Sequence, residues 1–171
     1  EALGKGGKMV IGPAGENLVK FAVVVSQERV HGRTGMGAVM GSKNLKAVVA
    51  NGKKKIAVDQ PDKFKKGVRK WVEMLKKHPA TGDLSPRYGT AQFVNTLAAK
   101  NCLPTHNFAK GTFSGAYNIS GERMAADFLK KNSGCATCPI RCGRVVEYDG
   151  KSIKGPEYET LCLMGSNLEI D

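Results

Sequence analysis

Three cysteines fall within eight residues, in the run Cys135-Ala-Thr-Cys138-Pro-Ile-Arg-Cys142. Thiols this close together oxidise or scavenge metal unless they are partnered. Two or three intervening residues allow the backbone to wrap around an iron–sulfur cluster, so that each sulfur reaches a different iron. Pro139 suits a tight wrap because its ring fixes φ and removes one backbone donor. The spacing therefore favours an iron–sulfur site with Cys135, Cys138 and Cys142 as metal ligands.

Two alternatives stay open for these cysteines. A structural zinc site commonly takes four ligands from two Cys-x-x-Cys pairs, and the sequence has no second pair. The other alternative is a set of thiols or disulfides without metal. Three thiols suit a cubane cluster better, with a fourth ligand supplied from elsewhere.

A second segment, residues 29–44, suits the binding of an anion. It holds four glycines in ten residues, which allow the backbone to approach a ligand closely. Arg29 and Arg33 offer planar guanidinium forks for phosphate or carboxylate. The segment does not match a Walker loop or a dinucleotide fingerprint. The alternative is a glycine-rich turn that binds nothing.

Glu157 and Glu159 are the candidate acid–base residues. They stand in the segment Gly155-Pro-Glu-Tyr-Glu-Thr160, where Pro156 favours the start of a helix. Carboxylates in the first turn of a helix also stabilise the helix dipole, so capping is an equal alternative. A catalytic carboxylate would need partial burial near a reacting centre.

Strands are predicted on both sides of the glycine-rich segment. Apolar residues predict strands over 9–11 and 46–50, and the continuous run Phe21–Val25 predicts a strand buried on both faces. The pair Asn51-Gly52 marks a turn. The glycine-rich segment would therefore connect the second strand to the third.

Helices are predicted after the lysine-rich linker at residues 53–55. The first begins near Pro61, ends at His78, and turns one apolar face to the core while lysines cover the other face. That apolar face comprises Phe64, Val68, Trp71, Val72 and Leu75. A second helix follows Tyr88 and ends near Asn101. Its inward residues are Phe93, Val94, Leu97 and Ala98.

The segments around the cysteines are a loop, a helix and a hairpin. Residues 104–118 predict a loop that packs through Phe108 and Phe113. A third helix, capped by Ser120, is expected to run to residues 132–134, directly before the cysteines. Beyond Cys142, the pair Asp149-Gly150 predicts a two-residue hairpin turn.

Composition limits the possible classes. The 171 residues are 41% hydrophobic and carry a net charge of +12, which favours acidic partners. Aromatic residues are few and do not alternate with basic runs, so nucleic acid is not an expected partner. No apolar run approaches the roughly 20 residues of a membrane span. Five cysteines, three of them crowded together, favour a reducing compartment, and a cytoplasmic location is expected. The chain begins with Glu1 and stops after an apolar run, so we expect a fragment of a longer protein.

Taken together, the glycine-rich segment, the cysteine run and the Gly-Pro-Glu-Tyr-Glu-Thr segment resemble the aldehyde ferredoxin oxidoreductase family of tungsten-pterin enzymes. The match is closest over Gly35-Met-Gly-Ala-Val-Met-Gly-Ser-Lys-Asn-Leu-Lys46. The resemblance implies an α+β chain. Residues 1–55 would be the C-terminal part of a β-rich pterin-binding domain, and residues 56–171 the start of a mainly α-helical domain that carries the iron–sulfur cysteine motif.

The resemblance also implies roles for single residues. Arg29, Val30, Gly32 and Arg33 would bind the two-pterin tungsten (or molybdenum) cofactor, with a magnesium ion expected between the pterin phosphates. Cys135, Cys138 and Cys142 would hold a [4Fe-4S] cluster whose fourth ligand lies beyond Asp171. Glu159, or else Glu157, would handle protons.

The activity implied is the oxidation of a small aldehyde to a carboxylic acid, with electrons passed to ferredoxin or a similar acidic carrier. A homodimer is a further expectation, and the isolated chain is expected to be inactive. Other members of the family reduce aryl thioesters, and this sequence does not separate the two. A non-catalytic iron–sulfur or zinc module is the alternative from another class. The arginine-bearing glycine segment discriminates between the two, since a simple module would have no need for it.

Overall fold

The computed structural model describes residues 4–27 and 29–171. The chain folds as two compact units, residues 1–57 and 58–171, and each is described by itself. Both units combine helices with antiparallel sheet, which confirms the predicted mixed class. None of the described helices is long and apolar enough to cross a membrane.

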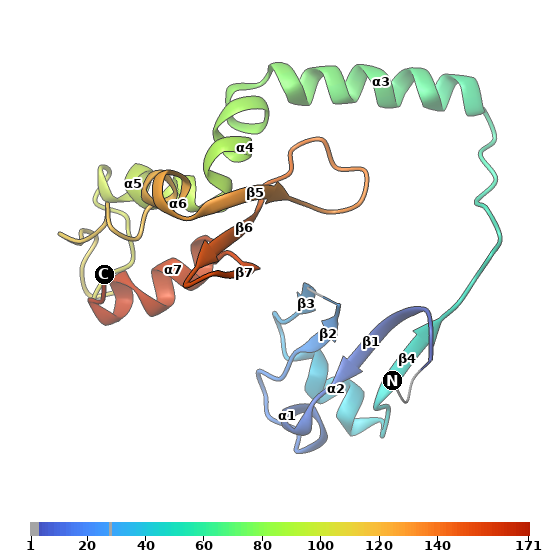
Figure 1. Ribbon diagram of the computed structural model, residues 1–171. Coiled ribbons are helices and arrows are strands. Elements are labelled where there is room, and N and C mark those ends of the chain that lie inside the picture. Colours follow the sequence, from blue (N-terminus) through green and yellow to red (C-terminus); the bar gives the residue numbers. More distant parts are fainter. Residues whose placement is uncertain (1–3, 28) are drawn as a thin grey trace. The chain divides into compact units, whose positions relative to one another are not determined.

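The first unit is built on a four-stranded antiparallel sheet in the order β3-β2-β1-β4 (Figure 1). The strands are β1 (Gly7–Ile11), β2 (Val24–Ser26), β3 (Arg29–His31) and β4 (Ala47–Ala50). The predictions for β1 and β4 are confirmed. The buried core of this unit consists of Ile11, Ala22 and Val24.

The strand predicted over Phe21–Val25 is shorter than expected and is buried on one face only. Only its last two residues belong to β2, and Phe21 is 81% exposed. Ala22 and Val24 are buried while Val23 and Val25 are exposed, which is the alternation of a strand with one covered face. Because every residue of this run is apolar, the sequence alone did not reveal the alternation of buried and exposed positions.

The glycine-rich segment is not a continuous loop. It contains β3 and the helix α2 (Met36–Ser42), which packs against the short helix α1 (Pro13–Glu16). A Cβ atom at Gly41 would lie 1.9 Å from the carbonyl oxygen of Gly15, so only glycine allows the two helices to approach this closely. Helix packing therefore accounts for part of the glycine content.

The second unit begins with the long helix α3 (Pro61–Lys77), whose predicted start and end are confirmed. Residues 51–60, before it, form no helix or strand. Shorter helical elements follow: the π-helical turn η1 (Ala80–Leu84), α4 (Ser85–Tyr88), the 3₁₀ turn η2 (Gly89–Gln92), α5 (Phe93–Ala98), α6 (Gly121–Asp127), α7 (Tyr158–Met164) and the 3₁₀ turn η3 (Ser166–Leu168).

A three-stranded antiparallel sheet completes this unit, with β5 (Leu129–Ser133), β6 (Gly143–Tyr148) and β7 (Lys151–Lys154) in that order. The predicted hairpin is confirmed, because Asp149 and Gly150 both have positive φ, as a type I′ turn requires. The third predicted helix ends earlier than expected. The Ser120 hydroxyl caps it as predicted, but residues 129–133 form β5 because they pair with β6.

Two small clusters make up the core of the second unit. One contains Ala91, Met124 and Val146, the other contains Val94, Leu103 and Ala116, and Leu161 packs against both. The inward predictions for Val94, Leu97, Ala98 and Phe113 are confirmed. Those for Phe93 and Phe108 are wrong, since both side chains are exposed.

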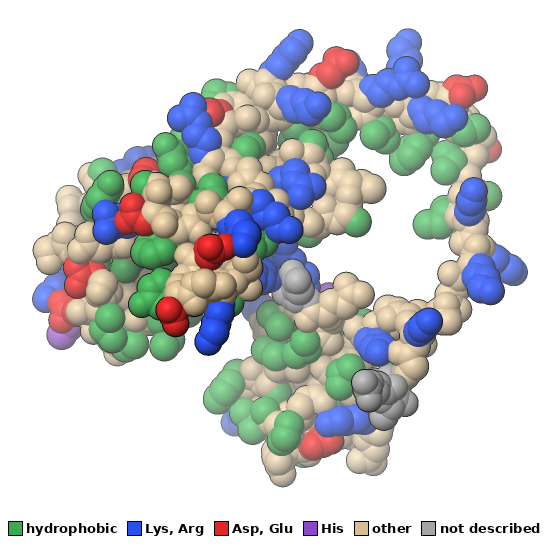
Figure 2. All heavy atoms as spheres, viewed as in Figure 1, with side chains coloured by type: hydrophobic (Ala, Val, Ile, Leu, Met, Phe, Trp, Pro, Cys, Tyr) green, Lys and Arg blue, Asp and Glu red, His purple; other side chains and the backbone are tan. Residues whose placement is uncertain are grey.

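Helix α3 leaves its apolar face largely uncovered. Phe64, Val68 and Trp71 are exposed, Trp71 by 60%, and no residue of α3 is buried. Their predicted place in the core is therefore wrong; Val72 and Leu75 are half-buried. Figure 2 shows basic side chains along one side of this helix and apolar ones along the other.

Candidate functional site

The three clustered cysteines lie in one loop, residues 134–142, which joins β5 to β6 (Figure 1). Cys135 is exposed, Cys138 and Cys142 are half-buried, and all three are free thiols. The backbone N–H of Cys138 donates to the carbonyl oxygen of Cys135 at 3.2 Å, which closes a tight turn. The structure shows no disulfide among these three cysteines, and the loop carries one exposed and two half-buried thiols.

The base of the cysteine loop is fixed by strand pairing and by hydrogen bonds to α4. Ser133 pairs with Gly143 across the sheet. The Asn132 side-chain amide donates to the carbonyl oxygen of Pro86 at 2.7 Å, and the Arg141 guanidinium donates to the Asn132 carbonyl oxygen at 3.2 Å. The two ends of the loop therefore have a defined geometry although its tip is exposed.

The donor chemistry of the loop fits an iron–sulfur cluster. In residues 4–27 and 29–171, no three His, Cys, Asp or Glu side chains converge closely enough to hold a metal ion. Three free thiols in one short loop are nevertheless the ligand type that such clusters use. Cys162 is buried in α7 and Cys102 is exposed, donating to the Lys100 carbonyl oxygen, so both are engaged elsewhere.

The predicted cofactor-binding residues Arg29, Val30, Gly32 and Arg33 lie in β3 and in the turn after it. Strand β3 is at the edge of its sheet, and an edge strand leaves backbone donors and acceptors unpaired on its outer side. Both arginines are exposed, Val30 is 61% exposed and Gly32 is half-buried. This edge can therefore offer two guanidinium groups together with backbone polar groups to an anionic ligand.

The two candidate glutamates stand at the start of α7. Glu157 is the N-cap residue, one position after Pro156, and its carbonyl oxygen accepts from the N–H groups of Thr160 and Leu161. Its carboxylate makes no side-chain cap hydrogen bond. Glu157 is half-buried, whereas Glu159 is exposed in the first turn. Glu157 therefore meets the expected partial burial better than Glu159.

Tyr158, between the two glutamates, was not singled out in the sequence. Its backbone N–H donates to the Thr90 hydroxyl at 2.9 Å, and its ring meets the Phe93 ring edge to face at 6.1 Å. Burial raises the pKa of Tyr158 to about 12, helped by a hydrogen bond with Cys162 and by the negative charges of Cys162 and Glu159. The tyrosine therefore stays protonated and anchors the start of α7.

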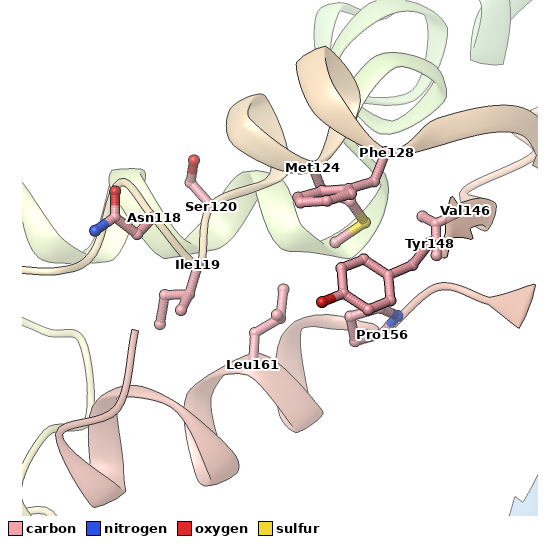
Figure 3. A pocket seen from close by; sticks show the side chains of 9 residues that line it. All are labelled: Asn118, Ile119, Ser120, Met124, Phe128, Val146, Tyr148, Pro156 and Leu161. Carbon is pink, nitrogen blue, oxygen red and sulfur yellow. The ribbon is translucent and has the colours of Figure 1, made fainter. Parts of the chain in front are cut away.

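A pocket of about 250 Å³ opens beside α6, β6 and α7 (Figure 3). Met124, Phe128, Tyr148 and Leu161 line its apolar wall, and Asn118 and Ser120 lie at one side. The Phe128 and Tyr148 rings lie 6.2 Å apart. None of its lining residues is a cysteine, histidine, acid or cation, so this pocket can bury an apolar group but has no acid–base chemistry of its own.

Sequence reasoning also missed Arg144, which is buried next to the cysteine loop. A signal for it was present. Arg144 and Val146 are both buried in β6, and a period of two places position 144 on the inward face of the strand. A charged residue at an inward position of a strand marks a site that needs a special partner.

Two family models match this chain. The model described as "Aldehyde ferredoxin oxidoreductase, N-terminal domain" matches residues 1–52. The model described as "Aldehyde ferredoxin oxidoreductase, domains 2 & 3" matches residues 66–171.

Curated relatives and a solved structure agree with these matches. The chain is 49% identical over 164 residues to the tungsten-containing aldehyde ferredoxin oxidoreductase of Pyrococcus abyssi, covering 94% of this chain and 27% of that protein. It is 30% identical over 174 residues to the aliphatic sulfonate oxidoreductase, WOR-like subunit, of Pyrococcus furiosus. This match covers 94% of this chain and 26% of that protein. The active site complex BamBC of benzoyl coenzyme A reductase shares the fold, with a TM-score of 0.67 at 23% identity, over 96% of this chain and 27% of that one. The chain thus spans about a quarter of the length of the relatives it matches.

Proposed function

The chain belongs to the aldehyde ferredoxin oxidoreductase family, a family of oxidoreductase enzymes, and on this premise we propose that it is part of a longer enzyme that oxidises aldehydes to carboxylic acids. The observation that carries the proposal is the presence, in one chain, of a loop with three cysteines that form no disulfide and of an exposed arginine-bearing sheet edge. A simple iron–sulfur carrier has no need for the second feature.

The family relatives are tungsten-containing, which implies a tungsten-pterin cofactor. We assign Arg29, Val30, Gly32 and Arg33 to the binding of this cofactor, through the two guanidinium groups and the backbone of the edge strand. Molybdenum in place of tungsten, and a magnesium ion between the pterin phosphates, belong to the same proposal. Guanidinium groups suit phosphate because they donate two parallel hydrogen bonds.

The cysteine loop would hold a [4Fe-4S] cluster through Cys135, Cys138 and Cys142. A cubane has four irons, so one further ligand must come from outside the loop. Cys162 is buried in α7 and Cys102 hydrogen-bonds within its own turn, which favours a ligand from outside residues 1–171.

When bound, the metal and pterin supply the two-electron oxidation, and the protein positions and tunes them. The aldehyde and one water molecule together give the acid, two electrons and two protons, and the carboxylate of Glu159, or else Glu157, would accept one of these protons. The three cysteine thiolates would bind the iron of the cluster, and the cluster would carry the electrons away. The basic surface then attracts an acidic ferredoxin, because opposite charges steer association.

A second candidate within the family is an oxidoreductase for another substrate, such as an aryl-thioester reductase. The 30% identical relative named for aliphatic sulfonates indicates that substrate use differs among related chains. The residues assigned above would be shared, so substrate assays on the full-length protein decide between the two.

The first experiment is elemental analysis and a visible spectrum of the anaerobically purified full-length protein. We expect tungsten or molybdenum together with about four irons per chain and the broad visible absorption of thiolate-bound iron. The triple variant C135S/C138S/C142S should lose iron but keep tungsten, whereas C102S should keep both. Zinc alone, without visible absorption, would overturn the oxidoreductase proposal in favour of a non-catalytic binding module.

A further inference from the structure

Arg144, the second residue of β6, is buried two positions after Cys142. Only 3% of its surface is exposed, although arginine is among the residues least often buried without a charged partner. Gly89 packs against this region so closely that a Cβ atom there would lie 2.6 Å from the Cys142 carbonyl oxygen. The Arg144 side chain therefore occupies a tight space between the cysteine loop and the start of η2.

The guanidinium of Arg144 joins three separate parts of the unit through hydrogen bonds. It donates to the carbonyl oxygens of Ser85, Pro86 and Arg87 in α4, at 2.7 to 3.0 Å. It also donates to the Asn132 side-chain oxygen at 2.8 Å and to the Arg141 carbonyl oxygen at 2.9 Å. Asn132 lies in β5 just before the cysteine loop and Arg141 lies near the end of the loop, so one side chain ties both ends of the loop to α4.

No carboxylate in residues 4–27 and 29–171 forms an ion pair with Arg144. The acceptors of its guanidinium are carbonyl and amide oxygens. An arginine stays charged in proteins. A buried cation of this kind is costly unless a negative group compensates it.

The arrangement identifies the group that compensates it. We propose that Arg144 is a positioning residue, which holds the ends of the cysteine loop and offsets the negative charge of the thiolates when they bind iron. This inference rests on the proposed iron–sulfur site. Neutral acceptors fix the guanidinium in place, and the thiolates of the loop that it holds would supply the missing negative charge.

Two consequences follow for the full-length protein. Removal of the hydrogen bonds should loosen the loop, so that iron is lost more easily. Removal of the positive charge should make reduction of the cluster less favourable, because charge and hydrogen bonding near the sulfurs set its reduction potential. A purely structural arginine would affect the first property and leave the second unchanged.

The test compares R144M and R144K with R141M in the anaerobically purified full-length protein. Arg141 lies in the same loop but is exposed and makes one hydrogen bond there, so R141M controls for the loss of one exposed charge and one hydrogen bond from the loop. We expect R144M to lose iron to a chelator about tenfold faster than the wild type, since hydrogen bonds from a buried charged group are worth more than one tenfold step. The remaining cluster should have a more negative reduction potential. R144K, which keeps the charge, should restore the potential but only part of the iron retention.

Equal reduction potentials in R144M and R141M would overturn the inference, and so would equal rates of iron loss. If R144M does not fold, R144K and R141M carry the comparison of iron loss, and the inference fails if these two agree. Failure of the proposed function is seen separately, as a wild-type protein without iron. In that case the alkylation rates of Cys135, Cys138 and Cys142 in the metal-free protein test the positioning role. They should rise about tenfold in R144K relative to R141M, and equal rates would refute it.

Discussion

At the scale of single residues, the two glutamates at the start of α7 differ in position and are therefore expected to differ in importance. The family resemblance ranks Glu159 first, although Glu157 is the more buried of the two. We predict that E159Q lowers kcat of the full-length enzyme by roughly 10²- to 10⁴-fold, the usual contribution of a general acid or base. E157Q is the matched control, because Glu157 lies two positions before Glu159 at the start of the same helix and the substitution removes the same charge. Steady-state kinetics that show the larger loss in E157Q would transfer the role to Glu157.

Tyr158 is expected to make the stability of the folded protein decrease as the pH rises through the alkaline range. Its pKa in the folded protein is about 12, above the ordinary value of 10.0, because burial disfavours the phenolate. Between these two values the unfolded chain releases the proton first, so the folded state binds more protons and stability falls as pH rises. Denaturant unfolding of the full-length protein should therefore show a decline from about pH 10 to about pH 12 that is smaller in Y158F. Identical pH profiles for the two proteins would contradict the assignment.

The role of a group of residues could be predicted from the sequence where its members lie close together along the chain. The three cysteines lie in one loop because only six residues separate the first from the last. Arg144 was not predicted, since its role depends on Ser85, Pro86 and Asn132, which the fold brings to it from other elements. The alternation in β6 could place position 144 on the inward face, but the partners of a buried polar network are set by tertiary contacts that a linear pattern does not contain.

At the scale of elements, α3 carries the charge that an electron acceptor would meet. The helix has seven basic and two acidic residues, and Figure 2 shows the basic ones gathered along one side. Lys76, in its last turn, lines a small recess together with Pro139 and Ile140 of the cysteine loop. This end of α3 therefore brings positive charge next to the proposed exit for electrons.

We predict that K76E slows electron transfer from the full-length enzyme to an acidic ferredoxin by about threefold at low ionic strength. The difference should disappear at high salt, since screening removes long-range attraction. K100E is the control, because Lys100 is exposed in the same unit at the end of α5. Stopped-flow rates that do not depend on ionic strength in any of the three proteins would refute electrostatic steering.

Element bounds followed local signals, whereas strand pairing did not. Pro61 and the His78-Pro79 pair set the limits of α3 correctly, because proline acts on its own neighbourhood. Residues 129–133 were predicted to be helical, because the third helix was expected to continue to the residues directly before the cysteines. Their pairing with β6, across the cysteine loop, prevailed over that local preference.

At the scale of the whole molecule, the mixed class and the family could be predicted from the sequence, while the degree of burial could not. Helical spacing correctly identified an apolar face on α3, but spacing alone does not say what covers it. In this chain nothing in the second unit buries Phe64 or Trp71. The curated relatives are about four times as long as the segment matched, so the periodicity is consistent with a face completed by further chain.

The last prediction concerns the 171-residue segment alone. We predict that it is inactive and retains neither tungsten nor a full complement of iron, because one cluster ligand and part of the pterin site are expected outside it. The indole of Trp71, which is 60% exposed, should be strongly quenched by acrylamide in the segment and protected in the full-length protein. The difference spectrum against W71F isolates this side chain, the only tryptophan of the segment. Equal quenching in both proteins would show that the apolar face of α3 stays open to solvent. A segment that holds its metals and oxidises aldehydes would mean that residues 1–171 contain the whole site.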